Sequence, residues 1–193
     1  RLPVRIGIVS DIHCNAAALD RAIEQMGDID ELLCAGDACY QYRFSNDVAE
    51  RLRQLGGRYV LGNHEEILLS EAGARAQASP SVDKSLLEWT RAQPYLLRTE
   101  IGSKKLLMFH ATPWAPYRDY LFPHDPQLQR LAEEEADFII YGHTHAPLVK
   151  RIGRALIVNP GSAGEMRGTE QVLTYAVLDT SDDHAEIEQI RFD

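Results

Sequence analysis

Residues 4–13 read VRIGIVSDIH, a short apolar run rich in β-branched side chains that ends in an Asp-x-His pair. Such a run predicts a buried strand, and buried strands are typical of sheets that are covered on both faces. The pair, Asp11 and His13, follows the carboxyl end of this strand, and open α/β sheets bind ligands beyond the carboxyl ends of their strands. This stretch therefore predicts a fold class and the position of a site within it.

The same arrangement recurs along the first third of the chain. Asn15 is a predicted helix N-cap, apolar residues follow at helical spacing, and Gly27 is expected to end the helix. A second strand is predicted at residues 31–35, a second helix at 46–55 and a third strand at 58–61. Alternating strands and helices place this part of the chain in the α/β class.

The rest of the chain changes from helices to strands. Residues 65–93 are predicted to be helical, with a surface loop at 74–81, where Ala and Ser accumulate. Further strands are expected at residues 96–101, 105–110, 138–141, 148–152, 155–159, 172–178 and 185–192, with one helix at 126–135. We expect a single domain, residues 1–193, of mixed α/β (α+β) class, in which two sheets pack together and helices lie outside.

The composition narrows the partners and the compartment. Asp and Glu number 29 against 20 Lys and Arg, a formal net charge of -9, so long DNA or RNA is disfavoured as a partner. The cysteines, Cys14, Cys34 and Cys39, are odd in number and lack paired spacing, which favours a reducing compartment. No apolar run approaches the roughly 20 residues that span a bilayer, and no leader cleavage site is recognisable. We therefore expect a cytoplasmic protein with no membrane partner.

Short polar motifs end the predicted strands, and they contain five of the seven histidines. In chain order they are Asp11-Ile12-His13, Gly36-Asp37, Gly62-Asn63-His64-Glu65, His110 and Gly142-His143-Thr144-His145. Imidazole and carboxylate ligands together suit divalent Mn, Fe, Ni or Zn. One carboxylate has two oxygens and can bridge two ions about 3.5–4 Å apart. The pattern predicts a metal site.

Each motif alone has an ordinary explanation. A single histidine such as His110 is more often a structural residue, and Gly-Asp or Gly-Asn mostly marks a turn. The segment from His143 to His145 taken alone would also suit a single zinc ion. That interpretation leaves four residues unexplained, namely Asp11, His13, Asp37 and Asn63, so the ordered set favours a larger centre.

The ordered set D-x-H, G-D, G-N-H, H and G-H-x-H resembles that of the calcineurin-like metallophosphoesterases. The segment 159–162, Asn-Pro-Gly-Ser, further resembles their small bacterial and archaeal YfcE-like branch. The resemblance extends from about residue 4 to 162. It implies a four-layer sandwich, with two mixed β-sheets flanked by helices.

The resemblance also implies a role for each matching position. A first metal ion would be held by Asp11, His13 and His145. A second ion would be held by Asn63, His110 and His143. Asp37 would bridge both ions, while His64 would lie outside the metal shell and meet the substrate phosphate or the leaving oxygen. Cys14 departs from the family pattern, which often has Gly there, but it removes no ligand.

The implied activity is hydrolysis of a phosphate ester by a hydroxide held between two divalent ions, with Mn the ion expected to serve in vitro. A small phosphodiester is the favoured substrate, and Asp37, Asn63 and His64 are the expected catalytic residues. Alternatives are a phosphomonoesterase, a nuclease, or an interaction scaffold of the same fold, as in the similar retromer subunit. Phosphatase activity would separate the scaffold from the enzymes.

Residues that select the substrate are less sharply indicated. Arg43 and Arg118 are candidates to grip phosphate beside Asn63 and His64. The aromatic residues after His110, namely Trp114, Tyr117 and Tyr120, either pack the loop onto the sheet or line a pocket for an aromatic group. The adjacent Glu65 and Glu66 are expected to make the rim of the site acidic. An exposed edge strand at 185–192 leaves a homodimer open.

Overall fold

The computed structural model describes residues 3–166 and 171–192. Its strands form two five-stranded mixed sheets. The first sheet has the order β10 (His184–Gln189), β9 (Thr174–Asp179), β1 (Arg5–Val9), β2 (Glu31–Cys34) and β3 (Arg58–Tyr59). Strands β1, β2 and β3 run parallel, and β9 and β10 are antiparallel additions at the side of β1.

The second sheet has a similar plan. Its order is β4 (Leu96–Ile101), β5 (Lys104–Phe109), β6 (Phe138–Ile140), β8 (Ala155–Asn159) and β7 (Leu148–Ile152). The three central strands, β5, β6 and β8, run parallel, while β4 and β7 pair antiparallel at the edges. Parallel strands in both sheets align several carboxyl ends, where a ligand site is expected.

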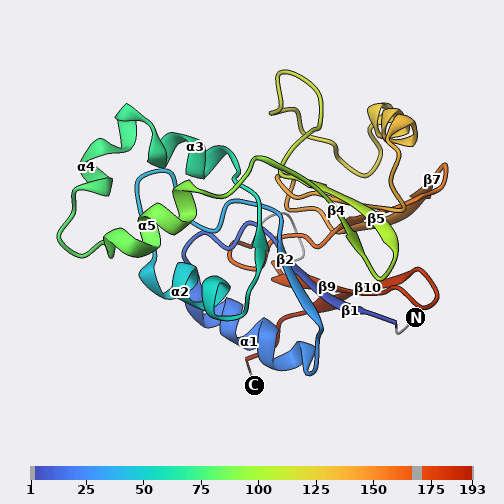
Figure 1. The fold of residues 1–193 in the computed structure, drawn as a ribbon, viewed down its shortest axis with the longest axis horizontal. Coiled ribbons are helices and arrows are strands. Elements are labelled where there is room, and N and C mark those ends of the chain that lie inside the picture. The colour runs from blue at the N-terminus through green and yellow to red at the C-terminus, as the bar shows by residue number, and fades with distance from the viewer. Residues whose placement is uncertain (1–2, 167–170, 193) are drawn as a thin grey trace.

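Three apolar layers hold the sheets and their covers together. The helices α1 (Ala16–Met26) and α2 (Asn46–Gln54) pack on the outer face of the first sheet (Figure 1). Buried side chains such as Ile8 and Met108 fill the space between the two sheets. The outer face of the second sheet is covered by the 3-10 helix η2 (Pro126–Glu133) and the loop before it. The predicted class and the two-sheet sandwich are confirmed. The four layers are the helices, the two sheets, and the loop with its 3-10 helix.

Most predicted boundaries agree with the structure. The Asn15 side chain accepts a hydrogen bond from the amide of Ala18 at 3.1 Å, and α1 ends before Gly27, which has φ 67°. The third strand is shorter than predicted and ends at Tyr59, and the amide of Leu61 donates to the Pro94 carbonyl instead of to β2. The ends of the last two strands differ from the prediction by one to three residues, and the helix predicted at 126–135 has 3-10 geometry.

Four short helices lie beside the sheets on the left of Figure 1: α3 (Asn63–Leu69), η1 (Glu71–Gly73), α4 (Ala74–Gln77) and α5 (Lys84–Arg91). The loop predicted at 74–81 is wrong for its first four residues, which form α4. The Gln77 side chain docks this turn by donating to the carbonyls of Leu68 and Ser70. In the described part of the chain, no helix is both long enough and apolar enough to cross a membrane.

Candidate metal centre

The polar motifs from both sheets meet at one place. Asp11 and His13 follow β1, Asp37 follows β2, and Asn63 and His64 open α3 after β3. From the second sheet, His110 follows β5, and His143 and His145 follow β6. Groups of three side chains, each offering a ligand atom within 4.8 Å of the others, are Asp11, His13 and His145; His13, Asp37 and His64; and Asp37, His110 and His143. We call the eight residues from Asp11 to His145 the nest.

Asp11 presents one carboxylate oxygen to the nest and holds backbone with the other. Its Oδ2 accepts hydrogen bonds from the Ser10 hydroxyl at 2.7 Å and from the amide of His143 at 3.0 Å. Its Oδ1 lies 3.2 Å from Nε2 of His145 and 3.8 Å from Nε2 of both His13 and His110. The carboxylate is therefore anchored on one side and free to bind a cation on the other.

Asp37 is arranged in the same way. Its Oδ1 accepts the amide of His64 at 2.9 Å. Its Oδ2 lies 3.1 Å from Nε2 of His110 and 3.7 Å from Nε2 of both His13 and His64. An oxygen surrounded by imidazoles from both sheets is in the position that a bridging ligand needs.

The imidazoles are fixed by their outer nitrogens. Nδ1 of His110 lies 2.7 Å from the Ala35 carbonyl, and Nε2 of His143 lies 3.1 Å from the Arg118 carbonyl. Because a carbonyl oxygen only accepts, each of these nitrogens must carry the proton. When such a ring is neutral, as a metal ion requires, its other nitrogen has a lone pair for the ion, and this outer-shell arrangement is typical of metal-binding histidines.

His13 is oriented by a carboxylate that the sequence did not reveal. Its Nδ1 lies 2.5 Å from Oε2 of Glu165, and the Tyr40 hydroxyl donates to the same oxygen at 3.2 Å. This leaves Nε2 of His13 facing both aspartates. Glu165 follows the Asn-Pro-Gly-Ser segment, so the loop after β8 supports a ligand that follows β1.

His64 and Asn63 occupy the edge of the nest. The His64 side chain is 14% exposed, against 2% for His13 and 5% for His110. Its ring contacts the rings of His13 and Tyr40, with centroids 4.8 and 5.0 Å away. His64 therefore lies at the rim of the nest, and it is also within ligand distance of His13 and Asp37.

The charges in the nest are strongly coupled. Burial raises the pKa of a carboxyl, but the surrounding histidines, His110 foremost, together outweigh burial and hold the pKa of Asp11 and Asp37 below the ordinary value. Burial opposes protonation of His110, but the charge of Asp37 and Asp11 raises its pKa to about 10. Burial, then the charge of His110, lowers the pKa of His143 to about 4. Two ionised carboxylates at the centre favour a cation.

The backbone of the nest is held in conformations that side chains rarely adopt. Five of the seven predicted metal ligands have positive φ, and these residues are Asp11 (52°), His13 (49°), Asp37 (55°), His143 (72°) and His145 (60°). Each such residue costs on the order of 1–3 kcal/mol and persists only where surrounding contacts impose it. Strain concentrated on one cluster marks this as a functional site.

Two glycines let the strand ends approach each other. A Cβ on Gly62 would lie 2.2 Å from Oδ1 of Asp37, and a Cβ on Gly142 would lie 2.7 Å from Oδ2 of Asp11. Contacts this short do not occur with real side chains. The glycines are therefore required for close packing around the two carboxylates.

The residues fit a bound divalent metal. Buried polar atoms without a hydrogen-bond partner among the described residues include Asp11 Oδ1, His13 Nε2, Asn63 Oδ1, His110 Nε2 and His145 Nδ1. Unpartnered buried polar atoms are rare and costly. Three of them lie together, because Nε2 of both His13 and His110 is 3.8 Å from Oδ1 of Asp11. Carboxylate oxygen and imidazole nitrogen atoms are suitable ligands for Mn, Fe, Ni or Zn.

Glu65 supports the backbone of the nest from inside, and its predicted place at an acidic rim is wrong. It is fully buried and accepts hydrogen bonds from the amides of Asp37 at 2.7 Å, Gly62 at 2.7 Å and Cys39 at 3.0 Å. It does not contribute to an acidic rim, because these amides draw it inside, and only Glu66 lies exposed there. The spacing from Gly62 to Glu65 suits a capping box, in which the glutamate side chain folds back to the backbone at the start of the helix. This signal in the sequence does indicate that the Glu65 side chain points inward.

The predicted substrate residues lie on opposite sides of the nest. Arg43 donates to the His13 carbonyl at 3.4 Å, and its guanidinium lies 5.8 Å from the Tyr40 ring. The Arg118 side chain is 70% exposed, and its guanidinium lies 3.9 Å from Glu66. The sequence did not reveal that the Arg118 carbonyl also orients His143.

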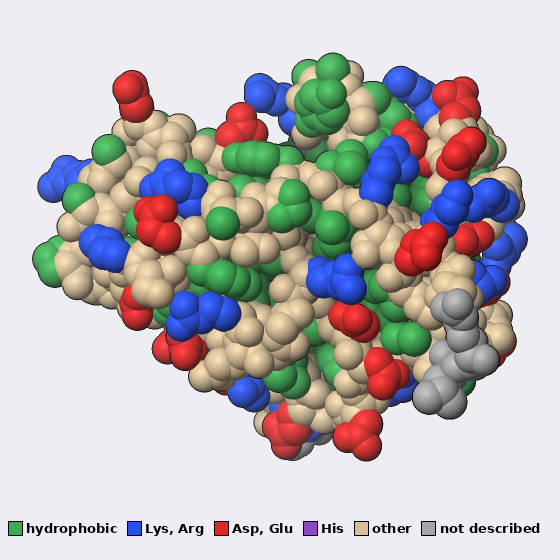
Figure 2. Space-filling model, in the orientation of Figure 1, with side chains coloured by type: hydrophobic (Ala, Val, Ile, Leu, Met, Phe, Trp, Pro, Cys, Tyr) green, Lys and Arg blue, Asp and Glu red, His purple; other side chains and the backbone are tan. Residues whose placement is uncertain are grey.

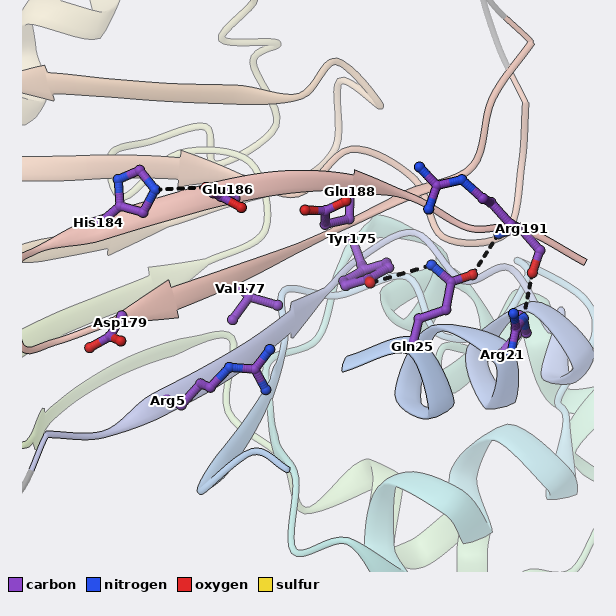
Figure 3. A pocket seen from close by; sticks show the side chains of 10 residues that line it. All are labelled: Arg5, Arg21, Gln25, Tyr175, Val177, Asp179, His184, Glu186, Glu188 and Arg191. Atoms are coloured by element: carbon purple, nitrogen blue, oxygen red, sulfur yellow. Dashed lines mark hydrogen bonds and ion pairs between the residues drawn. The ribbon is translucent and has the colours of Figure 1, made fainter. Parts of the chain in front are cut away.

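Two cavities of similar size lie at different distances from the nest. One, of about 760 Å³, opens directly beside it and is lined in part by Asn63, His110 and His143. Another, of about 650 Å³, lies on the outer face of the first sheet between β10 and α1 (Figure 3). Its polar side chains already pair with one another, as Gln25 does with Tyr175. The first cavity is the one connected to the metal-binding chemistry.

Comparisons with known proteins agree with this geometry. Residues 4–183 match the model of the calcineurin-like phosphoesterase superfamily domain. An uncharacterized protein from Methanocaldococcus jannaschii, MJ0912, is 26% identical over 216 residues, which cover 97% of this chain and 88% of that protein.

Solved structures show the same fold. A metallophosphoesterase from Sphaerobacter thermophilus superposes with a TM-score of 0.78 at 21% identity, over 99% of this chain and 89% of that one. A novel archaeal phosphodiesterase gives 0.63 at 21% identity, over 96% and 99% of the two chains. Vacuolar protein sorting 29 from Cryptosporidium parvum gives 0.63 at 18% identity, over 100% of both. The family match covers nearly the whole described sandwich, and this chain belongs to the calcineurin-like phosphoesterase superfamily, whose members hydrolyse phosphate esters.

Proposed function

We propose that this protein is a phosphodiesterase that uses two divalent metal ions held in the nest. The observation that carries the proposal is the pair of carboxylate oxygens, Asp11 Oδ1 and Asp37 Oδ2, each surrounded by imidazole nitrogens at 3.1–3.8 Å. Asp11, His13 and His145 are assigned to one ion, and Asn63, His110 and His143 to the other. Asp37 is assigned to both, because its Oδ2 lies 3.7 Å from Nε2 of His13 in the first group and 3.1 Å from Nε2 of His110 in the second.

Two bound divalent ions lower the pKa of water towards neutrality and neutralise charge on the phosphate. The residues of the chain supply the remaining functions. The anchored oxygens of Asp11 and Asp37 keep the carboxylates from rotating, and Glu165 keeps Nε2 of His13 aimed inward. The Asn63 amide, with Oδ1 buried at the edge of the nest, is placed to orient a phosphate oxygen.

His64 is assigned to the leaving group. Its ring is more exposed than those of His13, His110 and His145, so a substrate at the rim can reach it. A hydrogen bond or proton from this ring would stabilise the departing oxygen, an effect that typically accelerates hydrolysis by about 10²–10⁴-fold. Arg43 and Arg118, on opposite sides, are assigned to the substrate phosphate.

Assays of metal-stripped and Mn²⁺-restored protein test the proposal. We expect Mn²⁺-dependent cleavage of bis-p-nitrophenyl phosphate in preference to p-nitrophenyl phosphate. His64→Ala should lower turnover by about 10²-fold or more while the bound Mn²⁺ stays constant, and Asp37→Asn should lose both. No turnover of either compound by protein that binds two ions per chain would contradict the proposal.

The similar fold of vacuolar protein sorting 29 supports a second candidate, an interaction scaffold. The complete set of ligand residues favours the enzyme, since a scaffold needs neither anchored carboxylates nor oriented imidazoles. A nuclease is disfavoured by the net charge of -9. We also propose that the chain is a single domain, that it acts on a small phosphate ester and that it is cytoplasmic. A homodimer could form through the edge strand β10, and sedimentation tests this.

A further inference from the structure

The cavity of about 760 Å³ beside the nest has its own chemistry. Asn63, His110 and His143 line both the cavity and the nest, so the two spaces share a wall. A phosphate ester bound at the nest would therefore direct one of its organic groups into this cavity. The inference below rests on the proposed function and concerns that group.

The cavity is lined mainly by apolar and aromatic side chains. The deepest members are Leu61 and Phe109, which are 3% and 1% exposed. Its outer walls include three tyrosines, Tyr95, Tyr117 and Tyr120, which are 52%, 63% and 47% exposed. Large aromatic rings that remain uncovered around an apolar floor are a binding surface rather than core.

The loop that carries two of these tyrosines is fixed by its own contacts. Trp114 packs inward under the guanidinium of Arg130, which lies 3.9 Å from the ring centroid, and the Trp114 carbonyl accepts from Thr112 at 2.7 Å. The Tyr141 hydroxyl donates to the Leu121 carbonyl at 2.6 Å at the far end of the loop. The packing role considered for the aromatic residues therefore belongs to Trp114, while Tyr117 and Tyr120 face outward.

The surface view supports a hollow at this position. Hydrophobic side chains gather along the upper edge of the molecule, where the loop after β5 stands above the segment that leads into β4 (Figure 2). The surface between these two segments is recessed. The wall nearest the nest is itself aromatic, because the Tyr120 ring stacks on His143 with centroids 3.8 Å apart.

Charge in the cavity is confined to its mouth. The charged side chains of the lining, apart from the nest histidines, are Glu66 and Arg118, and they face each other at 3.9 Å. An opposed pair of this kind offers hydrogen bonds to a polar edge but no excess charge for a second phosphate. A flat, uncharged group with polar atoms on its rim matches such a lining.

We propose that this cavity binds an aromatic group esterified to the phosphate, and that Tyr95 and Tyr117 are specificity-determining residues for it. The ring lies between the tyrosines over the apolar floor formed by Leu61 and Phe109. A nucleoside and a simple aryl ester share this chemistry. Each aromatic contact adds about 0.5–1.5 kcal/mol, roughly 2–10-fold in affinity.

Binding of matched phosphate monoesters to the Mn²⁺-loaded protein, measured by calorimetry, tests this inference without turnover. The probes are methyl phosphate, phenyl phosphate and adenosine 5′-monophosphate, which carry the same phosphate group. We expect the two aromatic esters to bind at least about tenfold more tightly than methyl phosphate, as two aromatic contacts would give. Tighter binding of the nucleotide than of phenyl phosphate identifies a nucleoside, and equal binding identifies the bare ring.

The double variant Tyr95→Ala/Tyr117→Ala should reduce the aromatic advantage to about threefold or less, since both ring contacts are lost. Tyr42→Ala is the matched control, because Tyr42 is 59% exposed and does not line the cavity. An advantage absent from the native protein, or unchanged in the double variant, would overturn the inference. Turnover of bis-p-nitrophenyl phosphate in the same preparations separates the two proposals: without turnover the proposed function fails, whatever the binding preference.

Discussion

Asp11 and Asp37 each use one carboxylate oxygen for backbone amides or a hydroxyl and present the other to the nest. His110 and His143 divide their ring nitrogens in the same way, with a carbonyl on the outer side. Side chains held at two points have few alternative rotamers, so little conformational entropy is lost when a metal binds. The meeting of these candidate ligands was predictable, because each follows the end of a predicted strand. Their second partners were not, because those partners come from distant loops.

Glu65 provides the residue-level prediction. Glu65→Gln replaces one carboxylate oxygen with an NH₂ group, which donates hydrogen bonds and does not accept them. Either the Asp37 and Gly62 amides or the Cys39 amide then lose their acceptor. A buried donor left unpaired costs about 1–3 kcal/mol. Urea unfolding should show the free energy of unfolding reduced by about that amount.

Glu66→Gln is the matched control, because Glu66 is adjacent in sequence and exposed. Its free energy of unfolding should stay within about 0.5 kcal/mol of the native value. Equal stability of Glu65→Gln and Glu66→Gln would show that the buried carboxylate does not hold the two loops together.

The strands bring the residues of the nest together because they end close to one another. β1, β2 and β3 end at neighbouring positions of the first sheet, and β5 and β6 end at neighbouring positions of the second. Apolar patterning predicted these strands, since buried strands have few polar residues. It did not predict α4 or the short β3, because a side chain of α4 and the Pro94 carbonyl decide those boundaries through tertiary contacts. The cavity beside the nest was not predictable either, because its shape depends on the path of the long loop after β5, and hydrophobic periodicity does not describe loops.

Gly62, between β3 and α3, provides the element-level prediction. In Gly62→Ala the new methyl group would overlap Oδ1 of Asp37 and would lie 2.8 Å from Cγ of His110, so α3 or Asp37 must move. Displacing groups that support metal ligands typically lowers affinity by about 10–100-fold. Titration of metal-free protein with Mn²⁺ should show this loss.

Gly56→Ala separates metal binding from general strain. Gly56 has φ 63°, but a Cβ there would meet nothing within 4 Å. We expect this variant to lose stability through its backbone conformation and to keep native Mn²⁺ affinity. Similar Mn²⁺ affinity in both variants would indicate that Gly62 serves the turn alone.

The whole molecule is joined at the nest. The first sheet supplies Asp11, His13, Asp37 and Asn63, and the second supplies His110, His143 and His145. Metal binding should therefore stabilise the packing of one sheet on the other, in addition to the apolar layer between them. The net charge of -9 adds to the attraction of cations towards the protein.

Mn²⁺ at about 100 times its dissociation constant should stabilise the native protein by about 2.7 kcal/mol. For a chain of this length that corresponds to a rise in Tm of about 5–10 °C. Differential scanning calorimetry with and without Mn²⁺ measures it. Mg²⁺ at the same concentration is the control ion and should give a smaller rise, because imidazole is a poor ligand for it. An identical rise in Asp37→Asn would place the stabilising ion elsewhere.

The division of ligands between the sheets also has a consequence for chains that are cut. A break in the loop between α4 and α5 would leave Asp11, His13, Asp37 and Asn63 on one fragment and the three remaining histidines on the other. Neither fragment would own a complete binding site, and five of the strained backbone positions would be free to relax. The amount of metal retained by a mixture of the two fragments would then measure how much of the protein has reassembled, so metal binding reports reconstitution.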